Sequence, residues 1–189
     1  MSTKSSKSVS RIYQIKIVLQ DSKPPIWRRL LISDSINLYK FHQIIQIAMG
    51  WTDSHLHQFV IDDEYYSIPS PDDMRPIIDE RRYKVNQVAP LENDKLFYEY
   101  DFGDSWGHEI LVEKITLSDP DVKYPICVKG ERACPPEDVG GIWGYQDFLE
   151  AMYDPDHEEH DRFFDWWGSE FDSESFDLEG INLALRQLK

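Results

Sequence analysis

Three side chains that can bind a metal ion lie close together in one short segment of the chain. Asp101, Asp104 and His108 fall within the run Asp-Phe-Gly-Asp-Ser-Trp-Gly-His. The glycine and the acids favour a tight turn between two strands, which can bring these side chains to one side. Carboxylates suit Mg²⁺ or Mn²⁺, and an imidazole extends the choice to Zn²⁺ or Fe²⁺. A structural role is the alternative, with Asp bonded to backbone N–H groups and the neighbouring Trp106 packed in the core.

A second stretch of the chain offers further oxygens. Glu137 and Asp138 follow two prolines, and Gly140 and Gly141 come directly after them. Glycines allow a backbone to come close to a ligand or to the protein's own sheet. The candidates for ligand binding are therefore Asp101, Asp104, Trp106, His108, Glu137, Asp138, Gly140, Gly141 and Tyr145.

Two further histidines are candidate outlying metal ligands. His55 and His57 are two residues apart, so on a strand both side chains face the same way. That geometry suits metal binding and equally suits a half-buried sheet face. His157 and His160 are neighbours on an expected helix, where the surrounding acids indicate a solvated surface.

The two cysteines, Cys127 and Cys134, are spaced more widely than the paired ligands of a zinc knuckle. A zinc site would need two distant ligands, and a disulfide across the loop and idle thiols are the alternatives. The surrounding acids disfavour a thiolate, so catalysis by cysteine is not expected.

Charge is distributed unevenly along the chain. Residues 1–100 carry 13 acidic and 13 basic side chains, so the whole net charge of −15 lies in residues 101–189. A negative field repels phosphate backbones and anionic lipid surfaces, which disfavours direct nucleic-acid binding and favours a basic protein or a cationic ligand as partner.

No segment of the sequence predicts secretion or a membrane span. Residues 1–10 are polar and predict a flexible tail, and no apolar run approaches the ~20 residues that cross a bilayer. Two cysteines in 189 residues do not make a disulfide framework, so we expect a reducing, cytoplasmic setting.

Hydrophobic periodicity predicts strands first and helices last. Strands are expected at residues 13–19, 26–32, 55–61, 64–68, 95–100 and 106–117, and helices at 37–49, 145–153, 157–167 and 177–188. Residues 69–90 and 119–144 are expected to be surface loops. Phe163, Phe164, Trp166 and Trp167 nearly encircle one helix, so one pair should be buried and another can face a partner. The order of elements predicts a single α+β domain over residues 11–189.

Six segments together resemble the plasmid pRiA4b ORF-three-like family. They are Pro25–Arg29, Ala48–Trp51 with His55–Phe59, Tyr98–His108, Pro125–Cys127, Gly130–Asp138 and Gly140–Tyr145, in family order over about residues 11–185. The resemblance implies a mainly antiparallel, curved, roll-like sheet with one early helix and a C-terminal cluster of helices. It implies no activity, because the family is uncharacterised and some relatives are described as passengers of mobile elements. Relatives often carry a cysteine where this chain has Val139, so a family thiolate site would lack one ligand here.

Two hypotheses of function follow. The first is a non-enzymatic binding or adaptor module that uses its acidic loop-and-helix surface. The second is a metal-dependent hydrolase-type enzyme with Asp101, Asp104, His108, Glu137 and Asp138 around the ion and His55 or His57 as outlying ligands. The only cofactor that either hypothesis requires is a divalent metal ion.

Overall fold

The computed structural model describes residues 10–188. The predicted tail, residues 1–10, lies outside the described residues except for Ser10. The elements are β1 (Arg11–Leu19), β2 (Trp27–Ser33), α1 (Leu38–Met49), β3 (His57–Ile61), β4 (Glu64–Ser67), β5 (Ile78–Asp79), η1 (Glu80–Arg82), α2 (Val85–Val88), β6 (Lys95–Tyr100), β7 (Trp106–Leu117), β8 (Ile126–Glu131), α3 (Gly141–Tyr153), α4 (His160–Trp167) and α5 (Leu178–Gln187).

The strands form one eight-stranded sheet in the order β5-β4-β3-β6-β7-β1-β2-β8. Only the β4–β5 pair is parallel, and the other pairs are antiparallel. Register shifts interrupt the ladder at Gln14/Ile15 and at Arg29/Leu30, where an extra residue increases local twist. The expected α+β class with a mainly antiparallel sheet is confirmed.

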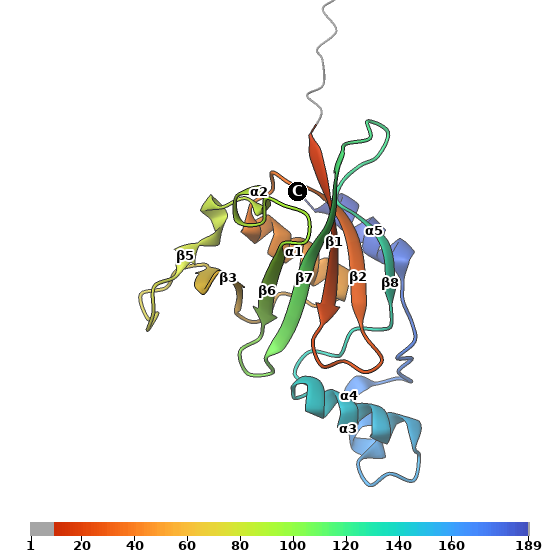
Figure 1. The fold of residues 1–189 in the computed structure, drawn as a ribbon. Helices are drawn as coiled ribbons and strands as arrows, with labels where there is room; N and C mark the ends of the chain where they lie inside the picture. Colours follow the sequence, from red (N-terminus) through yellow and green to blue (C-terminus); the bar gives the residue numbers. More distant parts are fainter. Residues whose placement is uncertain (1–9, 189) are drawn as a thin grey trace, which may run out of the picture.

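The core forms where α1 and α5 cover one face of the sheet (Figure 1). Alternate residues of β1 point into it, and Tyr13, Ile15 and Ile17 are each 0% exposed. α1 places Phe41, Ile44 and Ile45 against them. Asn37 accepts a hydrogen bond from the Lys40 N–H at the start of α1, and Gly50 ends the helix with φ 98°.

Helices α3 and α4 lie beyond one end of the sheet, next to the β1–β2 and β6–β7 turns (Figure 1). α3 packs on α4 chiefly through Phe148, whose ring meets Phe163 and Trp166 edge to face. At this end of the molecule the β6–β7 turn therefore lies next to α3 and α4, which belong to the acidic part of the chain.

Two segments that we expected to be surface loops contain regular structure. Residues 69–90 hold β5, η1 and α2, and residues 119–144 hold β8 and the start of α3. β8 was not predicted because its sequence does not alternate between apolar and polar residues. It is an edge strand, and only Cys127 and Gly130 in it are buried. η1 was not predicted because its one buried residue is Glu80, an acidic residue in a polar stretch of sequence.

Candidate functional site

The β6–β7 turn and the loop before α3 meet, as a site shared between these two segments requires. The Asp104 carboxylate accepts a hydrogen bond from the Gly140 N–H at 3.1 Å. A Cβ atom on Gly141 would lie 2.5 Å from the Asp104 carbonyl oxygen, and Gly141 has φ +69°. Glycine at position 141 therefore allows the two backbone segments to approach closely. The hydrogen bond from Gly140 to Asp104 holds the two segments together.

Three potential metal ligands gather at this junction. His55 Nδ1 lies 3.7 Å from Asp101 Oδ2, and His55 Nε2 lies 3.3 Å from Asp138 Oδ1. Asp101 is 8% exposed, whereas the Asp138 side chain is 70% exposed. The two carboxylates flank opposite nitrogens of one ring. An ion at Nε2 would therefore share Asp138, while Asp101 would orient the ring from behind.

The backbone around this cluster adopts uncommon conformations. Asp53, Asp101 and Asp138 have φ values of 59°, 55° and 60°. Such left-handed residues are infrequent outside glycine, although Asp tolerates them better than most. Asp101 compensates by accepting a hydrogen bond from the Gly103 N–H at 2.9 Å.

Glu137 reaches the junction but its oxygens are already engaged. One carboxylate oxygen accepts hydrogen bonds from the Thr52 hydroxyl and N–H at 2.6 and 3.2 Å, and the other accepts from the Tyr100 hydroxyl. The Tyr100 hydroxyl also accepts from the Ser54 N–H at 2.9 Å. Burial, followed by this bond to Glu137, raises the pKa of Tyr100. Glu137 and Tyr100 thus hold in place the segment that carries His55.

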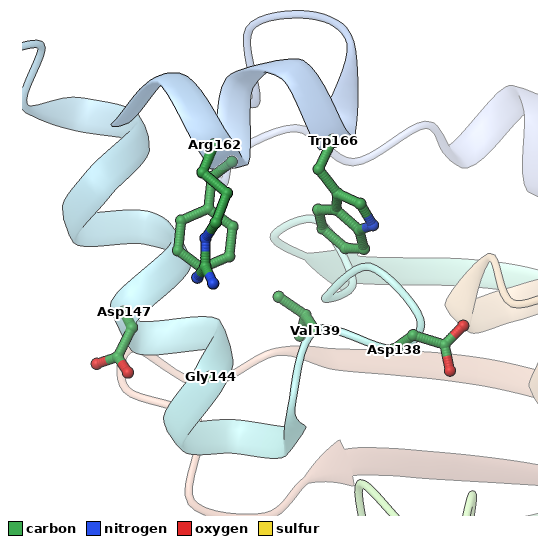
Figure 2. Close-up of a pocket in the computed structure, with 7 residues that line it drawn as sticks. Asp138, Val139, Gly144, Asp147, Arg162 and Trp166 are labelled. Atoms are coloured by element: carbon green, nitrogen blue, oxygen red, sulfur yellow. The ribbon is translucent and has the colours of Figure 1, made fainter. Parts of the chain in front are cut away.

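A pocket of ≈ 380 Å³ opens beside Asp138, between the loop before α3 and the helices α3 and α4. Figure 2 shows Trp166 descending from α4 toward Val139, with Arg162 stacked over a neighbouring ring. That ring is Phe163, whose centroid lies 4.4 Å from the guanidinium carbon. The lining residues are Asp138, Val139, Gly144, Asp147, Arg162, Phe163 and Trp166. Asp138 and Asp147 therefore line the same hollow as the aromatic rings, although Figure 2 shows that both carboxylates point away from its centre.

His108 does not join Asp101 and Asp104. Its side chain is fully buried between the rings of Trp51 and Tyr98, with centroids 5.3 and 5.5 Å away. Among the described residues neither ring nitrogen has a hydrogen-bond partner, and burial lowers the pKa of His108 to about 4. The reason is strand alternation, which points His108 into the core while the turn points outward.

Trp106 and Tyr145 also take core positions. Trp106 is 1% exposed and packs on Trp51, and Tyr145 is 4% exposed and meets the Phe171 ring edge to face. Neither the Trp106 Nε1 nor the Tyr145 hydroxyl has a hydrogen-bond partner among the described residues. Both side chains therefore lie in the core beneath the junction and do not line its surface.

His57 belongs to a separate, buried group of side chains. β3 begins at His57, so His55 lies in the preceding coil and the two rings do not share a strand face. His57 Nε2 lies 3.0 Å from both carboxylate oxygens of Glu80, which is 0% exposed. The His57 ring also stacks on His42, with centroids 3.4 Å apart.

Hydrogen bonds extend this buried group from His42 to the surface. A carboxylate can only accept, so His42 Nε2–H donates to Asp53 at 2.8 Å, and Nδ1 then accepts from the Tyr98 hydroxyl at 2.8 Å. That hydroxyl in turn accepts from the Gln46 amide at 3.0 Å. Burial, aided by the charge of His57, lowers the pKa of His42 to about 2. The chain of bonds rigidifies α1 against β6.

His42 and Glu80 are not among the site residues that the sequence predicts. His42 follows Leu38 by four positions and precedes Ile45 by three, so its place on the apolar stripe of α1 was a usable signal. Glu80 lies between polar neighbours, and nothing in its local sequence indicates burial.

The two cysteines are free thiols. Burial raises the pKa of both Cys127 and Cys134, which keeps them protonated and weakens them as nucleophiles and ligands. Among residues 10–188 neither thiol belongs to a group of three potential metal ligands.

No helix among residues 10–188 is long and apolar enough to cross a membrane.

Comparison with known proteins places the chain among uncharacterised relatives. It is 37% identical over 182 residues to the uncharacterised protein y4hQ of Sinorhizobium fredii (strain NBRC 101917 / NGR234), covering 95% of this chain and 93% of that protein. A crystal structure of the protein of unknown function MM3350 from Methanosarcina mazei Go1 matches with a TM-score of 0.85 and 35% identity, over 93% of this chain and 98% of the other. Residues 11–180 match the family described as plasmid pRiA4b ORF-3-like protein, and the chain belongs to that family.

Proposed function

We propose that the chain is a non-enzymatic binding module that takes a cationic side chain of a basic partner protein into the pocket between Asp138 and α4. The observation that carries this proposal is the lining of that pocket, where the Trp166 and Phe163 rings lie together with the carboxylate-bearing Asp138 and Asp147. Aromatic faces attract a cation through their quadrupole, and carboxylates supply the counter-charge.

The pocket already accommodates one guanidinium from the protein itself. Arg162 lies over the Phe163 ring at 4.4 Å and forms an ion pair with Glu159. Trp166 is 48% exposed beside it and presents the better ring for a cation. A lysine or arginine from a partner would therefore pack on Trp166, with Asp138 and Asp147 supplying negative charge at the edge of the pocket.

Charge and exposed aromatic area extend the binding surface around the pocket. All of the net charge of −15 comes from residues 101–189. On the same two helices Trp143, Tyr153 and Trp167 are 76%, 59% and 41% exposed. Aromatic residues of this kind dominate binding energies at protein interfaces, and a negative field accelerates the approach of a basic segment.

Titration with a labelled lysine- and arginine-rich peptide tests the proposal. The peptide should bind, its glutamine-substituted counterpart should not, and affinity should fall steeply between low and physiological salt. Trp166→Ala should weaken binding at least about tenfold, as expected for an interface hot spot. Tyr83→Ala is the matched control, because Tyr83 is 37% exposed just before α2 and does not line the pocket. Equal affinity for both peptides, or equal loss in both variants, refutes the proposal.

A divalent metal site at His55 is the second candidate, favoured by one observation. His55, Asp101 and Asp138 come from three separate segments, yet their ligand atoms lie within 4.8 Å of one another. Such a site, with water as further ligands, is the part of the hydrolase-type hypothesis that this geometry supports.

Thermal unfolding in the presence of Mg²⁺, Mn²⁺ or Zn²⁺ tests the metal site. A bound ion raises the melting temperature by mass action, and His55→Ala and Asp138→Asn should remove that rise. Asp104→Asn is the control and should keep it, because the Asp104 carboxylate is engaged with the Gly140 N–H. No rise with any of the ions, or a rise that His55→Ala leaves unchanged, excludes the site.

A further inference from the structure

Arg28 on β2 is a buried cation without a carboxylate partner. It is 2% exposed, and its hydrogen bonds all go to backbone carbonyls. Nε donates to Ala48 O at 2.8 Å, and Nη1 donates to Trp27 O and Glu131 O at 2.9 Å each. None of the ion pairs among residues 10–188 includes Arg28.

The protein neutralises this charge only in part. Ala48 lies in the last turn of α1, where the helix dipole presents partial negative charge, and the Phe176 ring lies 4.8 Å from the guanidinium carbon. Taking a cation out of water without a counter-ion costs several kcal/mol. The Arg28 Nη2 group has two N–H bonds, and no acceptor for them occurs among the described residues. Both N–H donors of Arg28 Nη2 therefore remain without a hydrogen-bond partner on one side of the guanidinium.

A pocket of ≈ 360 Å³ lies where Arg28 meets the gap between α1 and α5. Its walls are mainly apolar and include Ile47, Met49, Phe176, Ile181 and Ala184, together with the Cys134 thiol. A hollow with mainly apolar walls and a few polar groups is the usual form of a small-molecule site.

We propose that this hollow, the Arg28 pocket, binds a small monocarboxylic acid that carries an apolar chain. The carboxylate accepts hydrogen bonds from Arg28 Nη2, and the chain packs on Ile47, Met49 and Ile181. An anion is the occupant that supplies the missing counter-charge, and the apolar walls select a ligand with an apolar part.

Asp177 argues for a single negative charge on the ligand. It lines the same pocket, and its carboxylate accepts a hydrogen bond from the Gly180 N–H at 2.8 Å as the cap of α5. A second negative charge would be attracted by Arg28 and repelled by Asp177 alike, so it gains little, while a dianion such as phosphate costs more to take out of water than a carboxylate. The Arg28 pocket therefore favours a carboxylate over inorganic phosphate.

Thermal unfolding at constant ionic strength, with hexanoate, acetate, hexan-1-ol and inorganic phosphate as probes, tests the inference on the full chain. Hexanoate should raise the melting temperature in a saturable way. Acetate lacks the apolar chain, hexan-1-ol lacks the charge, and phosphate meets Asp177, so each of the three should give a much smaller rise.

Variants on α5 test the location without disturbing Arg28. Ala184→Trp fills the mouth of the pocket and should abolish the effect of hexanoate. Leu183→Trp is the matched control, because Leu183 is 58% exposed and faces a different hollow. Asp177→Asn keeps a capping side chain, removes the negative charge and should lower the apparent dissociation constant roughly fivefold.

Three results overturn the inference: no rise with hexanoate, an equal rise with hexan-1-ol, or a hexanoate effect that survives Ala184→Trp. An equal response to hexan-1-ol would identify an apolar groove without recognition of an anion. These outcomes are independent of peptide binding at Trp166, so either proposal can fail alone.

Discussion

The imidazole rings of His42 and His57 lie face to face, with centroids 3.4 Å apart and planes within 2° of parallel. Each ring is held at its edge by an acid, Asp53 for His42 and Glu80 for His57. Two protonated rings at this spacing would repel each other, so the stack is stable only with at least one neutral ring. His42 is that ring, because burial and the charge of His57 lower its pKa to about 2.

The first prediction is a loss of stability in mild acid. The folded state depresses the pKa of His42 to about 2 and of His108 to about 4, from 6.5, so the unfolded state binds more protons below about pH 6.5. The stabilising contribution is fully present above pH 6.5 and is lost as the pH falls below it. As the pH falls, each histidine lowers the free energy of unfolding by up to about 1.4 kcal/mol per pH unit.

Denaturant unfolding between pH 5 and pH 7.5 measures this loss. His42→Gln keeps a donor and an acceptor but no longer titrates, so the dependence on pH should become shallower by about one proton. If wild-type and His42→Gln proteins lose stability in parallel over this range, the folded protein does not exclude a proton from His42.

The second prediction concerns Glu80, whose carboxylate is fully buried against His57. Glu80→Ala leaves the ring without its partner and should cost about 3–5 kcal/mol of unfolding free energy. Glu109→Ala is the control, because Glu109 lies at the same 3.0 Å from Lys95 but its side chain is 47% exposed. That exposed pair should contribute less than about 1 kcal/mol.

A double variant distinguishes loss of the His57–Glu80 interaction from the cost of leaving one polar group buried without its partner. Replacing both His57 and Glu80 by apolar residues, as in His57→Phe with Glu80→Leu, should recover much of the loss, since no polar group then stays buried alone. Equal unfolding free energies for Glu80→Ala and Glu109→Ala would show that the buried pair does not stabilise the fold.

The third prediction tests the contact between the β6–β7 turn and α3. Gly141→Ala adds a Cβ atom 2.5 Å from the Asp104 carbonyl oxygen at a residue with φ +69°. The strain of a left-handed alanine is of order 1–3 kcal/mol, and the clash should add to it. Gly168→Ala is matched, because Gly168 also has positive φ, at +86°, but no atom lies within 4 Å of the added carbon.

Thermal or denaturant unfolding of the two glycine variants distinguishes strain from clash. Gly141→Ala should unfold at clearly lower denaturant than Gly168→Ala. If the two variants were equally stable, the turn and the loop would not be pressed together in solution as they are here.

The sequence predicts those parts of this fold that depend on local pattern. β6 and β7 begin and end at the predicted residues, because strict alternation and a turn with Gly103 mark both strands. α1 follows from its apolar stripe between Asn37 and Gly50. The structure brings residues 101–104 next to residues 137–141 through the Asp104–Gly140 contact, and the shared ligand site that their residue types predict stays a prediction.

Other features depend on tertiary contacts that local pattern does not report. His55 and His57 were expected to face the same way, but β3 starts only at His57 and the two rings enter different clusters. Glu80 is buried because His57 arrives from another strand. A pair of adjacent arginines such as Arg28 and Arg29 is typical of a solvated surface, and only the packing of α5 over α1 and β8 encloses Arg28.

Nuclear magnetic resonance mapping of a bound basic peptide is the most direct test of the proposed function. On titration with a lysine- and arginine-rich peptide, the Trp166 indole N–H and the amides of Asp138, Val139 and Gly144 should shift most, and should shift less as salt is added. Shifts confined to β4, β5 and α2, or no saturable shifts at low salt, would contradict binding of a cationic side chain at this pocket.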